Sequence, residues 1–153
     1  MAGYRPGETI VARLVVLGAA TALVVATSLV VTAFNFTARS WPPFVAGLAL
    51  TGLVYAALGA LVGAVLDKLG ATYLMLFVVM TDVGIVQNPM FGDGTPARGA
   101  ALLPGYGPMR MMVDGAFSTS FQTAGELVLA LAWTVVLGAG VYVVLRRAVG
   151  PRS

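Results

Sequence analysis

Cysteine and histidine are both absent from this chain of 153 residues. Without cysteine the chain has no disulfide framework, no thiolate nucleophile and no thiolate metal site. Without histidine it also lacks the commonest metal ligand and general base, and a Ser-His-Asp triad is excluded. Because these absences remove most catalytic chemistries, we expect a non-catalytic chain that binds no metal and no cofactor.

Charge is scarce as well. Only 10% of the residues are charged and 59% are hydrophobic, whereas about a quarter of a soluble domain is charged. The single lysine, Lys68, follows Leu66-Asp67 instead of a glycine-rich loop, so the chain has no phosphate-binding loop of an ATPase. The arginines flank apolar stretches and form no patch, which predicts no nucleic-acid partner. The composition indicates an all-α integral membrane protein.

Four apolar stretches organise residues 1–153 as a single transmembrane domain. Each is about the 20 residues that a helix needs to cross a hydrocarbon core of ~30 Å. Valine is frequent, but an isolated strand in lipid leaves its backbone unsatisfied, so helices are expected. Trp41 is placed at an interface, and Pro42-Pro43 can open a helix. The predicted spans are residues 14–34, 44–66, 70–88 and 125–145.

Arginine and lysine residues predict the orientation. With four spans, both termini lie on one side of the membrane. That side has six basic residues, namely Arg5, Arg13, Lys68, Arg146, Arg147 and Arg152. The other side has three, namely Arg39, Arg98 and Arg110. Since cytoplasmic loops are enriched in basic residues, we expect a multi-pass protein of the plasma membrane with both termini in the cytoplasm.

The segment between the third and fourth spans, about residues 90–123, is apolar but interrupted by proline and glycine. The third span must end near Asn88, because Pro89 disfavours a helical residue before it. We therefore predict an extracytoplasmic segment that is re-entrant or interfacial. Within it, residues 108–117 are expected to form a short helix at the membrane surface, where Arg110 and Asp114 would pair one turn apart.

Asp82 lies inside the third apolar stretch. An ionisable side chain within a span requires a partner or a wet cavity. One interpretation is a proton or substrate contact, and the other is a structural pair with Arg110 or a capping role near the helix end. We hypothesise a structural anchor whose carboxylate accepts from free N–H groups of the irregular segment 103–107. Glu126 is expected to complement the dipole at the start of the fourth helix.

Several motifs together resemble a known family. They are Met80-Thr81-Asp82-Val83-Gly84, then Gln87-Asn88-Pro89, and then Leu103-Pro104-Gly105-Tyr106-Gly107 followed by Arg110 and Asp114. This arrangement is similar to the C-terminal part of type-2 ABC-transporter permeases, in which a re-entrant hairpin lies between the last two spans. The N-terminal run from Arg5 to Arg13 resembles the end of the cytoplasmic coupling region that precedes the family's third span.

The resemblance implies a permease subunit that forms an export pathway with a second permease subunit, while separate P-loop ATPase subunits bind and hydrolyse ATP. It implies structural or pathway roles for Asp82, Pro104, Gly105, Tyr106, Arg110, Asp114 and Glu126, and ATPase-coupling roles for Arg5, Glu8 and Arg13. Only the C-terminal two-thirds of a six-span family member is matched, so a truncated or split permease is expected.

Two other functions stay open. The first is a stand-alone four-helix membrane protein that scaffolds or regulates a partner without transport. The second is a small proton-coupled exporter that uses Asp82. The exporter is the weaker alternative, because Asp82 lies about 18 Å along its helix, beyond the middle of a ~30 Å core.

Overall fold

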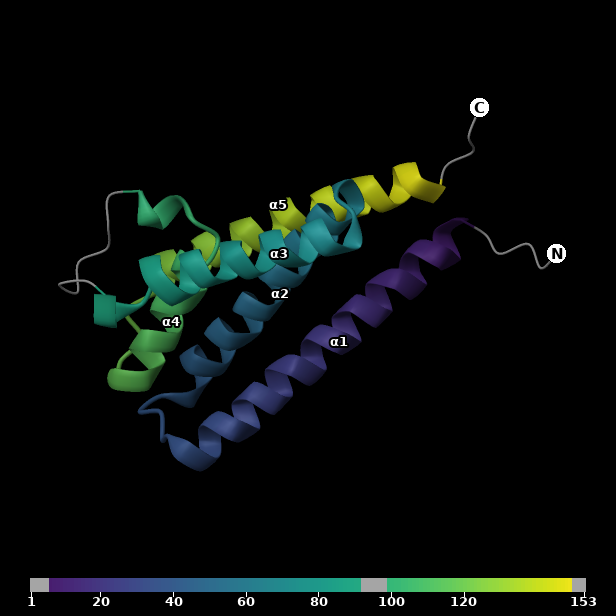
Figure 1. Ribbon diagram of the computed structural model, residues 1–153. Helices are drawn as coiled ribbons and strands as arrows, with labels where there is room; N and C mark the ends of the chain where they lie inside the picture. The colour runs from purple at the N-terminus through teal and green to yellow at the C-terminus, as the bar shows by residue number, and fades with distance from the viewer. Residues whose placement is uncertain (1–5, 92–98, 150–153) are drawn as a thin grey trace.

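The structure, a computed structural model, describes residues 6–91 and 99–149. Within these two ranges every regular element is a helix, as the sequence predicts. The five α-helices are α1 (Pro6–Asn35), α2 (Trp41–Val65), α3 (Lys68–Val79), α4 (Tyr106–Phe117) and α5 (Ala124–Val149) (Figure 1). Three short helical pieces, η1 to η3, lie between α3 and α4.

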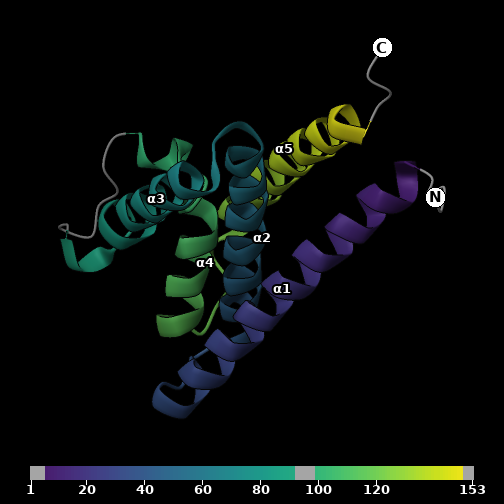
Figure 2. The same cartoon turned by 45° about the vertical axis from the view of Figure 1, so that its right-hand side comes forward.

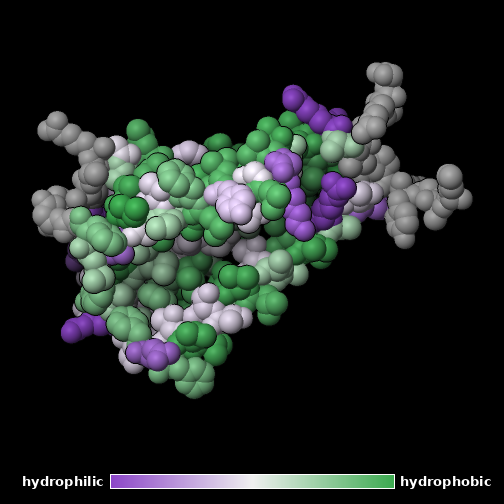
Figure 3. Space-filling view, viewed as in Figure 1, coloured by the Kyte–Doolittle hydropathy of each residue, from purple (hydrophilic) through white to green (hydrophobic). Residues whose placement is uncertain are grey.

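Four helices are long and apolar enough to cross a membrane, which confirms the predicted fold class. They cover Gly7–Asn35, Trp41–Val65, Lys68–Val86 and Ala124–Ala148. The first begins earlier than the predicted residue 14, because Pro6 opens a helix with Glu8 in its first turn. Hydrophobic side chains cover most of the visible surface, and the hydrophilic ones gather toward its two ends (Figure 3).

Helix α2 is the central element of the bundle and packs against α1, α3, α4 and α5. Two views show the start of α1, the end of α5 and the turn between α2 and α3 at one end of the molecule (Figures 1 and 2). We call this the terminal end. The loop between α1 and α2 and the link from α4 to α5 lie at the opposite end, which we call the hairpin end. Helix α1 crosses the bundle at an angle, and none of its most apolar 18-residue stretch is buried (Figure 2).

Small hydrophobic clusters join the helices. At the α2–α5 contact, Val54 is fully buried beside Ala57, Leu137 and Val141. Toward the hairpin end, Leu50, Met111 and Ala130 join α2, α4 and α5. A third cluster consists of Ala38, Phe44 and Ala116. Since two of the three clusters include α4, this short helix belongs to the core of the bundle.

The chain turns where the sequence places its helix signals. Ser40 is the N-cap of α2, and proline occupies the first turn of that helix, as predicted for Pro42-Pro43. At the other end of α2 the Asp67 side chain accepts from the Gly70 N–H at 3.3 Å and caps α3. The connection between these two spans is therefore a turn of very few residues.

The third span changes its helical geometry partway, which the sequence did not predict. After Val79 it continues as η1 (Met80–Val86), a π-helix. The Gln87 N–H donates to the Asp82 carbonyl at 2.9 Å, a bond that spans five residues. The next piece, η2 (Pro89–Phe91), is a 3-10 helix, so the predicted break at Asn88-Pro89 is confirmed. π-Helical turns are rare in proteins, and those that occur are often at functional sites.

Candidate functional site

Helix α4 lies inside the bundle, antiparallel to the first half of α2. Gly105 before its first turn adjoins Tyr55, and Gly115 near its last turn adjoins Phe44. Its buried residues are Gly107, Pro108, Met111, Gly115 and Ala116. The helix predicted over residues 108–117 is present, with one face buried against its neighbours, and its location at the membrane surface stays a prediction. The chain returns to the bundle here, because a face of small and apolar residues lets α4 pack against α2 and α5.

Three glycines allow this close packing. A Cβ atom on Gly47 of α2 would lie 2.6 Å from the Pro108 carbonyl oxygen of α4. One on Gly115 of α4 would lie 2.5 Å from the Phe44 nitrogen, and one on Gly107 would lie 2.5 Å from the Glu126 carbonyl oxygen of α5. Real Cβ atoms do not approach so closely, so the backbones of α4 and its neighbours touch only because these side chains are absent.

Asp82 is the centre of a buried polar cluster and is only 4% exposed. Its Oδ2 atom accepts from the Tyr55 hydroxyl of α2 at 2.5 Å and from the Gly105 N–H at 3.0 Å. Its Oδ1 atom accepts from Gln87 Nε2 at 3.1 Å. The carboxylate thus joins α2, the π-helix and the turn that begins α4. The predicted contact between a carboxylate of the third span and an N–H of the irregular segment is confirmed.

The backbone around Gly105 fits this contact. A 3-10 piece, η3 (Ala100–Leu102), precedes it, and Leu103 is extended, as a residue before Pro104 should be. A Cβ on Gly105 would lie 2.5 Å from the Tyr55 hydroxyl and 2.9 Å from Asp82 Oδ2. The Gln87 amide also donates to the Ala100 carbonyl at 3.2 Å. Asp82 and Gln87 of the third span therefore both bind the backbone of the residues that precede α4.

Arg110 does not join this cluster. Its guanidinium carbon lies 5.7 Å from the centre of the Tyr106 ring, in a cation–π arrangement. Between these described side chains the structure has no ion pair from Arg110 to Asp82 or to Asp114, so neither predicted pairing is found. Tyr106 lies four residues before Arg110 on the same helix face, where the ring can receive the guanidinium.

Asp114 instead connects α4 to α5. Its Oδ2 atom accepts from the Gln122 N–H at 3.1 Å and from the Thr123 hydroxyl at 3.3 Å. Thr123 is buried and immediately precedes α5. Glu126 lies in the first turn of α5, as predicted, and its carbonyl faces Gly107. These contacts fix the start of the last span against α4.

Carbonyl groups at the C-terminal end of α4 accept hydrogen bonds from the loop between α1 and α2. The Ser40 N–H donates to the Gly115 carbonyl at 2.8 Å, and the Arg39 N–H donates to the Ala116 carbonyl at 3.3 Å. The last carbonyls of a helix have no partner within it, so donors from elsewhere must supply one. Both ends of α4 are therefore held by hydrogen bonds from other elements.

The predicted coupling residues lie far from this cluster along the chain. Glu8 and Arg13 belong to the first two turns of α1, at the terminal end, and Arg5 lies outside the described residues. The predicted site residues thus separate into two sets. One set surrounds α4, and the other lies near the start of α1.

Sequence reasoning missed Tyr55 and the role of Gln87. A tyrosine hydroxyl within an apolar span is a signal in itself, because a buried hydroxyl requires a partner. Gln87 was visible as the polar residue before Asn88-Pro89 but was interpreted only as the end of the span. Gly47 carried no signal, because its importance depends on the helix that packs against it.

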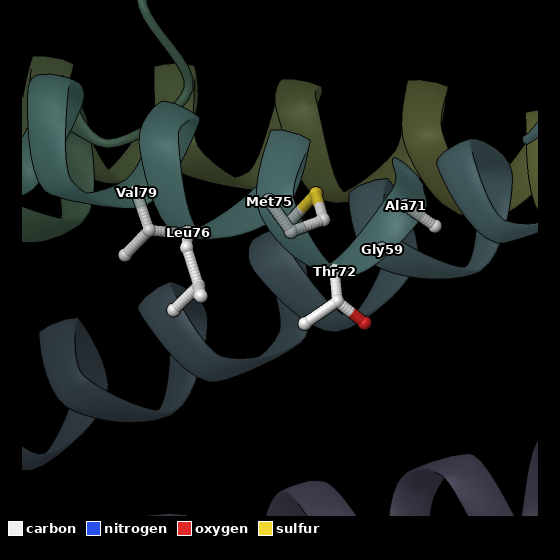
Figure 4. A pocket seen from close by; sticks show the side chains of 6 residues that line it. All are labelled: Gly59, Ala71, Thr72, Met75, Leu76 and Val79. Atoms are coloured by element: carbon white, nitrogen blue, oxygen red, sulfur yellow. The ribbon is translucent and has the colours of Figure 1, made fainter. Parts of the chain in front are cut away.

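Other features of the described chain offer little chemistry. A groove of about 430 Å³ between α2 and α3 is lined by Gly59, Ala71, Thr72, Met75, Leu76 and Val79 (Figure 4). The one hydroxyl among the described residues that line it, that of Thr72, already donates to the Lys68 carbonyl at 2.8 Å. Among the described residues no group of three or more acidic side chains could hold a metal ion.

The fold and the site together define a class: an all-α membrane protein with a short helix that packs against two of the spans and is held by a buried carboxylate. No family model, curated protein or solved structure matches the chain.

Proposed function

We propose that this chain is a transmembrane permease subunit of an ATP-driven exporter. One observation carries the proposal: a half-length helix, α4, re-enters the bundle between the third and the last span. A span, a re-entrant helical segment and a final span follow in the order that the resemblance to type-2 ABC permeases implies. In this proposal a second permease subunit completes the pathway, and separate P-loop subunits bind and hydrolyse ATP.

The distribution of charge gives each end of the molecule a role in this proposal. Among the described residues the terminal end has Arg13, Lys68, Arg146 and Arg147, and Arg39 and Arg110 lie toward the hairpin end. By the positive-inside rule the terminal end faces the cytoplasm of the cell, where ATPase subunits bind. The start of α1, with Glu8, is then the coupling site. The Asp82 cluster keeps the re-entrant segment in place at the outer part of the pathway.

The proposal is tested by purification from native membranes in mild detergent. We expect the isolated chain to hydrolyse no ATP, because it has no phosphate-binding loop. We expect a complex that contains a P-loop ATPase to hydrolyse ATP, and Glu8→Gln to reduce the amount of ATPase that co-purifies. Arg39→Gln, at the opposite end of the molecule, is the matched control and should leave it unchanged.

Two results would contradict this function. ATP turnover by the isolated chain would place the catalytic site in this subunit. A stable complex that lacks any ATPase would favour the alternative, a four-helix membrane scaffold or regulatory protein without transport.

A further inference from the structure

A second groove lies among three spans, near the terminal end. It encloses about 160 Å³ between α1, α2 and α5. Among the described residues that line it, Arg13 is the one that carries a charge. Its apolar lining includes Leu14 and Leu17 of α1, Ala60 and Ala64 of α2, and Val141 and Leu145 of α5.

The three helices give this groove a polar mouth and an apolar interior. Arg13 precedes Leu17 by four residues, or about 6 Å along α1 toward the terminal end. On α5, Arg146 and Arg147 directly follow Leu145 in the last turn. All three arginines therefore lie on the terminal-end side of the apolar lining. Such a layout matches a molecule with an anionic head and a hydrocarbon tail.

The arginines at the mouth form no ion pair with a described acidic residue. Arg13, Arg146 and Arg147 are exposed, and none forms an ion pair with another described residue. Asp67, in the turn between α2 and α3, caps α3 through the Gly70 N–H. Glu8 lines a different hollow, with Gly7, Val11 and Ala12.

We propose that this groove binds an anionic phospholipid from the leaflet at the terminal end. The phosphate lies on the Arg13 guanidinium, whose planar donors match phosphate oxygens in a bidentate manner. One acyl chain follows the apolar lining toward Leu17 and Val141. Basic pockets between transmembrane helices are sites where anionic headgroups bind. A free phosphate ion would leave the apolar lining unused.

Native mass spectrometry of the full chain in detergent tests the proposal. Phosphatidylglycerol and phosphatidylcholine with identical acyl chains are added in equal amounts, and the bound lipids are counted. We expect one phosphatidylglycerol to bind with about fivefold preference, which corresponds to the roughly 1 kcal/mol that one arginine gains near anionic lipid. Arg13→Gln should bring the preference close to one.

Two further variants separate the groove from general charge. Ala64→Phe fills the groove and leaves every arginine in place, so it should abolish the bound phosphatidylglycerol; Ala64 is exposed, and the fold should tolerate the ring. Arg110→Gln, away from the terminal end, is the matched control and should retain the preference. The proposal is overturned by equal binding of the two lipids to the wild type. It is also overturned by an unchanged preference in Arg13→Gln or Ala64→Phe, or by displacement of the lipid with millimolar inorganic phosphate.

Discussion

The Asp82 carboxylate acts as a helix cap from another element. Gly105 is the N-cap of α4 and has no side chain with which to satisfy the orphan donors there. Asp82 of the π-helix accepts from its N–H instead. A negative charge at this position also complements the positive end of the α4 dipole. Within a lipid-surrounded bundle, where water cannot replace the missing acceptor, this contact holds the re-entrant turn in place.

Substitution of Asp82 should therefore destabilise the fold. Asp82→Leu leaves the Tyr55 hydroxyl and the Gly105 N–H without an acceptor. The Gln87 amide still donates to the Ala100 carbonyl. At about 1–3 kcal/mol for each buried donor without a partner, we expect a loss of roughly 2–6 kcal/mol in the free energy of unfolding. Asp82→Asn retains one acceptor oxygen and should cost less. Thermal unfolding in detergent measures both variants.

A double-mutant cycle identifies the partner. Tyr55→Phe removes one of the three donors to the Asp82 carboxylate, so its effect combined with Asp82→Leu should be smaller than the sum of the single effects. Arg110→Leu is the control, and its effect should add to that of Asp82→Leu, because no ion pair joins the two described side chains. An Asp82→Leu variant as stable as the wild type would contradict the anchor and favour a proton-handling role.

At the scale of elements, the position of α4 depends on direct backbone contact with α2 and α5. The two helix faces have small residues where they meet, with Gly47 against Pro108 and Gly115 against Phe44. In lipid, apolar side chains gain little from association, so close backbone approach and the packing that it permits must stabilise the pair. These glycines are therefore structural requirements of the re-entrant segment.

Alanine substitutions distinguish contact glycines from the others. Gly47→Ala and Gly115→Ala insert a methyl group against backbone atoms, which should destabilise the fold by about 1–3 kcal/mol each. Gly138→Ala, in the interior of α5 with no atom within 4 Å of the added Cβ, is the matched control. It should be neutral or stabilise the fold by up to about 1 kcal/mol through helix propensity. The measurement is again thermal unfolding, and equal effects at Gly47 and Gly138 would contradict the close packing.

The elements differ in how far the sequence could predict them. Hydropathy and length identify the four spans, and Pro42 and Pro89 mark boundaries because proline restricts the local backbone. The location of α4 depends on which helix faces fit together, and no local pattern records that Gly107 meets the Glu126 carbonyl. The π-helix cannot be predicted from a local pattern either. It places the Asp82 side chain against Tyr55 and Gly105, which are both far from Asp82 in the sequence.

The candidate site was therefore predicted in part. Asp82 was identified because a carboxylate within an apolar span demands a partner, and its contact with the segment 103–107 followed from the unsatisfied backbone there. Charge alone favours Arg110 as the partner, yet the Asp82 carboxylate accepts hydrogen bonds from a tyrosine, a glutamine and a backbone N–H. Charge complementarity between two residues does not specify their separation in space.

At the scale of the whole molecule, the described basic residues lie in two zones, one at the terminal end and one toward the hairpin end. Both described ends of the chain and the turn between α2 and α3 lie at the terminal end (Figure 1). Between the zones, long faces of α1 and α3 present large apolar side chains such as Leu23, Val24, Leu76 and Phe77. Lipid is the solvent that such apolar faces require.

Orientation in the membrane decides whether the proposed coupling region can meet a cytoplasmic ATPase. Because the chain has no cysteine, a single introduced cysteine reports its own side. Ser120→Cys places it in the exposed link between α4 and α5, and Ala148→Cys places it in the last turn of α5, with no change of charge at either position. In intact cells an impermeant maleimide should label Ser120→Cys alone, and Ala148→Cys should react only after permeabilisation. The reverse pattern would put the start of α1 outside the cell, where a cytoplasmic ATPase subunit could not bind it.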